Sequence, residues 1–275
     1  MSTFALICPV CKSPLQQQEQ RLGCEHNHSF DRARQGYWNL LLPQRKRSKE
    51  PGDSADMVQA RQRFLQAGHY APLAQAIIDL LQPYVQTTQA GNLLDLGCGE
   101  GWYTDQLQRQ LKLNVAGLDI SKPAVRTASR RNPDILWLVA TGADIPLADE
   151  SVDMASLIFG RLLPEPTARV LKPGGLMLVV YPGPEHLRAL RGLIYEQVRD
   201  SSGFSPEQAL AQQFEPVALE RLAFEFRLDN AEAVQDLLAM TPHGQRLNSA
   251  ARERIAACSA LTEQADFRLS LLRKR

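Results

Sequence analysis

The feature that most constrains this chain is a glycine-rich loop between a short apolar run and a helical stretch. Residues 94–101 read Leu-Asp-Leu-Gly-Cys-Gly-Glu-Gly. Glycines at such a place let the backbone turn sharply and approach a ligand closely at the carboxyl edge of a parallel sheet. The spacing is G-x-G-x-G and not the dinucleotide spacing G-x-G-x-x-G, so a pyrophosphate resting on the next helix is disfavoured.

From Gly91 onward, short apolar runs alternate with helical stretches, which is typical of a parallel sheet covered by helices. This pattern predicts an α/β fold with helices at 103–110 and 122–131. A long helix is expected from Leu187, with another helix at 231–240. The expected strands are Leu93–Leu96, Val115–Leu118, Ile135–Val139, Met154–Phe159, Leu176–Tyr181, Leu222–Arg227 and Phe267–Leu272.

A carboxylate follows the loop at the end of the second expected strand. Asp119 lies 18 positions after Gly101, where it can accept hydrogen bonds from the two hydroxyl groups of a ribose. The alternative is that the glycines form only a tight turn and that Asp119 only caps a helix. Because the loop, its strand and the acid coincide, we favour a cofactor site.

At these residues, over about 91–181, the sequence resembles class I S-adenosylmethionine-dependent methyltransferases, whose fold is Rossmann-like. The resemblance implies that residues 95–101 hold the methionine part of the cofactor and that Asp119 holds its ribose. It places the adenine at residues 140–147, where Thr141 stands in place of the usual acid. Residues 159–166 follow the fourth strand, where such enzymes shape the acceptor pocket.

The spacing of three cysteines and a histidine near the N-terminus predicts a metal site. Cys8, Cys11, Cys24 and His28 form the pattern C-x2-C-x12-C-x3-H. Two close thiols on one turn, with a thiol and an imidazole on another, can converge on one tetrahedral, structural zinc ion. His26 is a rival fourth ligand, although a gap of two residues from Cys24 strains the chelate. The other alternative is that the four residues stay free of metal.

Cysteine use and hydropathy indicate the compartment. Five cysteines, three of them within the first 24 residues, do not resemble a disulfide framework. No apolar run approaches the roughly 18 residues that span a bilayer, and the N-terminus lacks the pattern of a secretory signal. We therefore expect a cytoplasmic protein without a membrane partner.

Charge is distributed unevenly although the whole chain carries only +1. Residues 32–63 contain eight basic and three acidic residues, a net charge of +5, so this segment can contact an anionic partner. It contains Arg45-Lys46-Arg47 and Lys49, with Tyr37 and Trp38 available to stack on unpaired bases. The alternative is an ordinary solvated linker.

The zinc ligands and the linker add a resemblance to one particular family of methyltransferases. Residues 8–31, 36–41, 51–54, 68–70 and 182–187 are similar to the 23S ribosomal RNA guanine-N1 methyltransferases. The resemblance implies a zinc-binding RNA-recognition domain at 1–36, a basic linker and helix at 37–68, and a methyltransferase domain at 69–275. It further implies a homodimer that acts on a hairpin-loop guanine of 23S ribosomal RNA and not on DNA. The implied cofactor residues are Tyr70, Asp95, Gly97, Gly99, Glu100, Asp119 and His186.

The acceptor chemistry remains open at this level. Guanine N1 carries a proton, so a base, or stabilisation of the charge that builds on O6, should assist transfer. His186 and Asp153 are candidates by position only, and no catalytic residue is assigned. Two other functions are a small-molecule methyltransferase with a purely structural zinc, and a non-catalytic zinc-ribbon adaptor.

Overall fold

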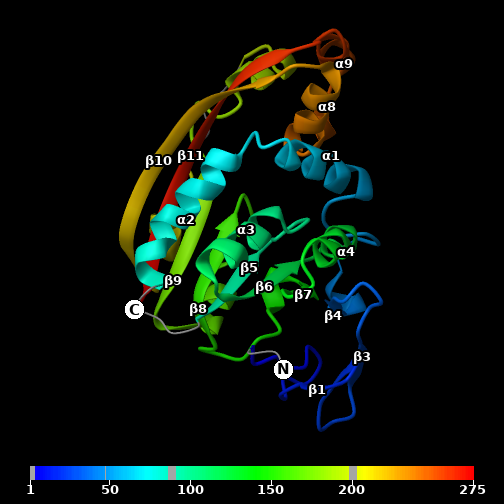
Figure 1. Cartoon of the computed structure of the whole chain (residues 1–275), viewed down its shortest axis with the longest axis vertical. Coiled ribbons are helices and arrows are strands. Elements are labelled where there is room, and N and C mark those ends of the chain that lie inside the picture. The colour runs from blue at the N-terminus through cyan, green and yellow to red at the C-terminus, as the bar shows by residue number, and fades with distance from the viewer. Residues whose placement is uncertain (1–3, 47, 86–90, 198–202) are drawn as a thin grey trace.

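A mixed eight-stranded sheet forms the centre of the protein (Figure 1). The computed structural model describes residues 4–46, 48–85, 91–197 and 203–275. Strands β9, β8, β5, β6, β7 and β4 are parallel, and β11 and β10 continue the sheet as antiparallel strands. The strands, in spatial order, are β10 (Phe214–Leu228), β11 (Leu261–Lys274), β9 (Leu171–Pro182), β8 (Val152–Ile158), β5 (Asn92–Leu96), β6 (Asn114–Asp119), β7 (Leu136–Val139) and β4 (Trp38–Asn39).

Helices cover both faces of this sheet, which has an apolar cluster on each side. Leu93 belongs to one cluster and Leu94 to the other, as the alternation of side chains along a strand requires. Helices α2, α3, α4, α6 and α8 contribute to the first cluster, and α5 and α7 to the second. The helices are α1 (Ala55–Gln66), α2 (Ala71–Val85), α3 (Trp102–Leu111), α4 (Lys122–Arg131), α5 (Pro164–Val170), α6 (Arg188–Ile194), α7 (Pro206–Leu210), α8 (Ala231–Ala239) and α9 (Ser249–Ala256).

The N-terminal segment carries its own small sheet and also packs on the large one. Strands β1 (Gln16–Gln18), β2 (Arg21–Gly23) and β3 (Ser29–Asp31) form an antiparallel sheet. Leu6 and Leu22 lie in the second apolar cluster, and β4 pairs with β7 at the edge of the large sheet. The segment before α1 is therefore attached to the rest of the fold through a shared core.

Most elements expected from Gly91 to Tyr181 are confirmed, including all five strands and the helices at 102–111 and 122–131. Helix α1 begins after Ser54, whose hydroxyl oxygen accepts a hydrogen bond from the Met57 backbone N–H at 3.3 Å. This is the geometry of an N-cap residue. Of the basic run, Arg47 lies outside the described residues.

The expected long helix from Leu187 is wrong. Helix α6 has only seven residues, and Tyr195 after it is extended. The Arg254 side chain from α9 donates a hydrogen bond to the Leu193 carbonyl oxygen at 2.8 Å, so a tertiary contact satisfies an end of the helix that the local pattern leaves open. The last two strands are also longer than expected because β10 and β11 pair with each other along almost their whole length.

Candidate functional site

The glycine loop after β5 lies at the carboxyl edge of the parallel strands. Gly97, Gly99 and Gly101 all have positive φ, at 70°, 56° and 79°, which glycine adopts without steric cost. The backbone N–H groups of Gly97 and Cys98 donate to the Leu118 carbonyl oxygen at 2.7 and 3.1 Å. These bonds tie the loop to the end of β6 and leave its outer side available to a ligand.

Asp95 lies at the base of this loop and is buried. Its carboxylate accepts hydrogen bonds from the Thr104 hydroxyl at 2.6 Å and from the Ser156 hydroxyl at 2.7 Å. Burial raises the pKa of Asp95 to about 6. The side chain therefore connects β5 to α3 and β8 beneath the loop.

The raised pKa of Asp95 predicts a pH-dependent stability. Its ordinary pKa is 3.8, so the folded state binds the proton more tightly than the unfolded state does. The free energy of unfolding should fall as the pH rises from about 4 to about 6, by about 3 kcal/mol for a shift of roughly two pKa units. Asp95→Asn should remove this fall in urea unfolding without cofactor.

The matched control for that experiment is Asp229→Asn, because Asp229 is an exposed carboxylate paired with Arg227. The quantity to compare is the difference in free energy of unfolding between wild type and variant at pH 4 and at pH 7. A difference for Asp95→Asn that stays constant with pH would contradict the assignment.

Two further carboxylates face the loop. Asp119 accepts hydrogen bonds from the backbone N–H groups of Gly99 at 3.0 Å and Ser121 at 2.7 Å. Glu100 is 2% exposed, and its Oε1 has no hydrogen-bond partner among the described residues. Burial raises the pKa of both carboxyl groups. The loop is thus lined by acceptors that suit ligand hydroxyl and ammonium donors.

Arg61 is a site residue that the sequence analysis did not identify. It extends from α1 and pairs with Asp53, and its Nη1 lies 3.4 Å from the position that a Cβ on Gly99 would take. Arg61 also contributes an attractive charge to Glu100 and Asp119. No local pattern marks this arginine, because α1 reaches the loop only through the tertiary fold.

Tyr70 and His186 are brought together with a group of aromatic rings. Their ring centroids are 6.2 Å apart, and Phe267 lies 5.1 Å from Tyr70 and 4.7 Å from His186. Tyr70 is 2% exposed, so it is buried within this group. The Tyr103 hydroxyl is buried without a partner among the described residues. Burial raises the pKa of Tyr103, and the nearby Tyr70 and Glu100 raise it further. Tyr103 therefore connects this aromatic group to the loop.

His186 is a neutral imidazole in this position. The Asp266 backbone N–H donates to its Nδ1 at 3.3 Å, which leaves the ring proton on Nε2. Burial lowers the pKa of His186 to about 4. A ring of this kind donates from Nε2 and is a weak proton acceptor, so it does not suit the base that guanine N1 requires.

The other candidate base, Asp153, is wrong because it lies at the opposite edge of the sheet. It is the second residue of β8, whereas the glycine loop follows the carboxyl end of β5. Its carboxylate accepts hydrogen bonds from the Asn92 backbone N–H at 2.9 Å and from Lys172 Nζ at 2.7 Å. Parallel strands separate the two edges by their full length.

A cavity of about 1050 Å³ opens beside His186. Pro182, Gly183, Tyr195 and His243 also line it, and the Tyr195 hydroxyl lies 2.9 Å from Nδ1 of His243. His186 is the predicted cofactor residue that faces this space. The cavity therefore adjoins the aromatic group through His186, after the end of β9.

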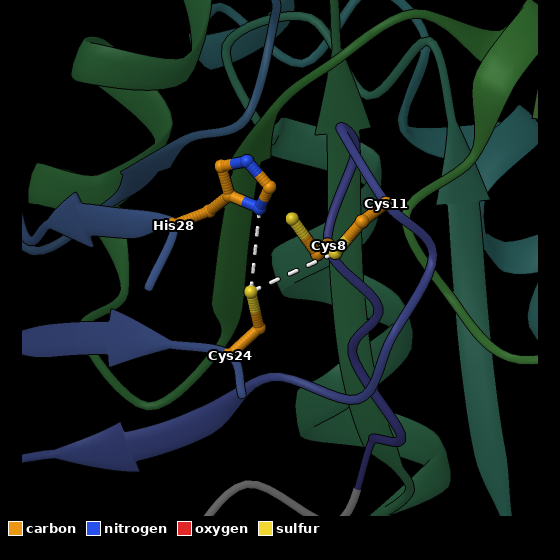
Figure 2. Close-up of side chains that lie close together, drawn as sticks. All are labelled: Cys8, Cys11, Cys24 and His28. Atoms are coloured by element: carbon orange, nitrogen blue, oxygen red, sulfur yellow. Dashed lines mark hydrogen bonds between the residues drawn. The ribbon is translucent and has the colours of Figure 1, made fainter. Parts of the chain in front are cut away.

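The predicted metal ligands converge at one point (Figure 2). One donor atom of each residue lies within 4.8 Å of those of the other three. The Cys11 and Cys24 sulfur atoms are 3.7 Å apart, and Cys24 Sγ is 3.5 Å from His28 Nδ1. Zinc–sulfur bonds of about 2.3 Å in a tetrahedron require sulfur atoms about 3.8 Å apart. The donor set and its spacing fit zinc.

His26 points to a different neighbour. Its Nδ1 lies 3.1 Å from the Ser13 hydroxyl oxygen, and 59% of the side chain is exposed. The geometry favours His28 over His26 as the fourth ligand.

A hydrogen bond from the Ser13 backbone N–H lowers the pKa of Cys11 to about 5, which favours the thiolate form that binds metal.

Tyr37 and Trp38 do not form a surface for stacking on bases. Both are buried, at 3% and 2% exposed, and Trp38 is part of β4. The Arg32 guanidinium lies 5.9 Å from the centroid of the Trp38 ring. The expectation that these two rings stack on unpaired bases is therefore wrong.

Comparison with known proteins gives the family. Residues 6–49 match the zinc ribbon described as "RlmA, N-terminal", and residues 93–175 match "Methyltransferase domain". A relative from Streptomyces fradiae, "23S rRNA (guanine(748)-N(1))-methyltransferase", is 38% identical over 86% of this chain and 84% of its own. The chain belongs to the 23S rRNA (guanine-N1)-methyltransferase family. The family confirms an S-adenosylmethionine-dependent methyltransferase with a zinc ribbon.

Two further comparisons agree with this family. A "Putative 23S rRNA (guanine-N(1)-)-methyltransferase" from Micromonospora griseorubida is 34% identical over 98% of this chain and 97% of its own. A solved structure described as "MccD protein" has a TM-score of 0.51 and 18% identity, covering 74% of this chain and 98% of its own. This likeness concerns the fold alone and confirms the α/β class. Within the described residues, no helix is both long and apolar enough to cross a bilayer.

Proposed function

We propose that this methyltransferase transfers a methyl group from S-adenosylmethionine to N1 of a guanine in a hairpin loop of 23S ribosomal RNA. The observation that carries the proposal is the combination, in one chain, of the loop at the edge of β5 with a converged set of zinc donors. The relatives that share both modules are named for this reaction. Bound S-adenosylmethionine supplies an electrophilic methyl group on a sulfonium.

The residues present fit this cofactor. A Cβ at Gly97 would meet nothing within 4 Å, so the loop has an open side. Glu100 Oε1 and the Tyr103 hydroxyl, which have no hydrogen-bond partner in the described part of the chain, can each bind a polar group of the ligand. We assign cofactor binding to seven residues: Tyr70, Asp95, Gly97, Gly99, Glu100, Asp119 and His186. Asp119 suits the ribose hydroxyls, and Asp95 acts by holding the loop in place.

The remaining task of the chain is to align the acceptor and to exclude water. Buried rings at Tyr70 and Phe267 provide an apolar wall beside His186. The Nε2–H of His186 is a donor near the place where the acceptor must approach. A donor aimed at O6 stabilises the charge that builds there as N1 loses its proton.

We propose a division of labour along the chain, with 1–36 recognising RNA, 37–68 forming a basic linker and helix, and 69–275 carrying out transfer. Lys46 and Lys49 are exposed, so they are free to meet phosphates, whereas Arg45 pairs with Asp144 at 3.6 Å. The proposal includes a homodimer in the cytoplasm. Light scattering of the purified chain tests the dimer.

The decisive test compares ribosomal RNA from cells with and without the gene by mass mapping. One guanine should lose one methyl group when the gene is absent, and the purified enzyme with S-adenosylmethionine should restore it. The control is a complementing gene that carries Gly97→Ala. Unchanged methylation of every guanine would overturn the substrate, and turnover of a small acceptor would support the small-molecule alternative.

A further inference from the structure

Phe159 has an unusual backbone for an aromatic residue. It follows β8 directly at the carboxyl edge, and its φ is +58°, in the left-handed region that bulky side chains rarely adopt. Such a conformation persists only when the surroundings impose it, and it is found mainly at functional sites. Among the described large apolar side chains Phe159 is one of the few exposed, at 42%.

The surrounding structure holds this conformation in place. The Phe159 backbone N–H donates to the Val180 carbonyl oxygen at 3.0 Å. A Cβ at the next residue, Gly160, would lie 2.4 Å from Leu157 Cδ1 and 3.6 Å from the Leu96 carbonyl oxygen. The turn is thus packed against the end of β5, where the glycine loop begins.

Buried rings support the Phe159 side chain from behind. Its ring is stacked with His186 at an interplanar angle of 19° and a centroid distance of 6.5 Å. Phe267 lies 5.3 Å away. The ring is consequently held on one side by the aromatic group and is open to solvent over the exposed part of its surface.

We propose that Phe159 is the platform on which the acceptor base, an unpaired purine, stacks. This inference rests on the proposed function and identifies the part of the site that receives the substrate. A fixed and exposed ring suits stacking because little conformational freedom is lost when the base binds. Sequence-specific RNA recognition takes bases that are splayed out and stacks them on aromatic side chains. The turn that carries Phe159 lies at the end of β5, where the loop assigned to the methyl donor begins, so a base stacked on the ring would lie at the same edge of the sheet as the methyl donor.

The test measures methylation of a hairpin RNA by Phe159→Ala and Phe159→Trp. Loss of one stacking contact should raise KM for the RNA about 10–100-fold in Phe159→Ala, with the affinity for S-adenosylmethionine by calorimetry unchanged. Phe159→Trp should retain activity, and its added fluorescence should be quenched by the hairpin. The control is Phe204→Ala, because Phe204 is also exposed but contacts Tyr181, which packs on the other face of the sheet.

The outcomes separate this inference from the proposed function. If the wild type methylates a guanine and Phe159→Ala keeps the wild-type KM, the platform is wrong and the function stands. If the wild type methylates no ribosomal guanine, the function is wrong. The platform is then decided by the Phe159→Trp fluorescence, which must be quenched more by a hairpin containing guanine than by one with an abasic site at that position. Equal quenching overturns it.

Discussion

Replacing Gly101 with alanine should destabilise the protein by about 2–5 kcal/mol in urea unfolding. Its φ of +79° belongs to the left-handed region, which costs an alanine about 1–2 kcal/mol. The added Cβ would lie 2.5 Å from Trp137 Cη2 and 2.8 Å from Ala128 Cβ. Forcing an extra atom into a filled core lowers the free energy of unfolding by about 1–3 kcal/mol more. The strained loop should also lose affinity for S-adenosylmethionine.

Two other glycines separate the causes of this effect. Gly174 has φ of +75°, and a Cβ there would meet nothing within 4 Å, so Gly174→Ala measures backbone strain alone. Gly97→Ala should match Gly174→Ala in stability but lose cofactor affinity in calorimetry, because its Cβ enters the open side of the loop. Equal stability of the variants at Gly101 and Gly174 would contradict the packing at Gly101, and full cofactor affinity of Gly97→Ala would contradict the cofactor site.

Removing the metal should unfold the N-terminal module and lower the stability of the whole chain. Metal analysis should find one zinc per chain. Structural zinc contributes an apparent binding free energy of about 10–16 kcal/mol in zinc-finger peptides. Cys11→Ser should therefore lower the free energy of unfolding by well over the ~1 kcal/mol that is typical of a single substitution. The effect should spread because Leu6 and Leu22 share an apolar cluster with the large sheet. Thermal unfolding with and without a chelator measures it.

The control for the metal experiment is Cys258→Ser. Cys258 is a partly buried free cysteine that lies outside the metal cluster, with its Sγ 3.2 Å from the Ala260 carbonyl oxygen. This variant should keep its zinc and respond to the chelator as the wild type does. A chain that stays fully folded at the same temperature after zinc removal would show that the module needs no metal.

The parts of the fold that could be predicted are those that depend on residues close together in the sequence. The loop at 97–101 was predictable because its glycines stand between a strand and a helix. The prediction of a long helix from Leu187 was wrong: the backbone becomes extended at Tyr195, and Arg254, some sixty residues away, satisfies the Leu193 carbonyl oxygen at this end of α6. The stacking role expected of Tyr37 and Trp38 failed for a similar reason: β4 joins the edge of the large sheet and buries both rings.

By itself, the sequence determined the α/β class, the glycine loop with Asp119, and the four metal donors, whose spacing along the chain allows them to bind one ion. These features depend on short stretches of backbone, so local conformational rules are sufficient. Only the tertiary structure decided that Arg61 lies over Gly99, that Asp153 faces the wrong edge, and that Phe159 rests on His186. These outcomes depend on strand order and on contacts between distant segments, which the packing of the whole chain sets.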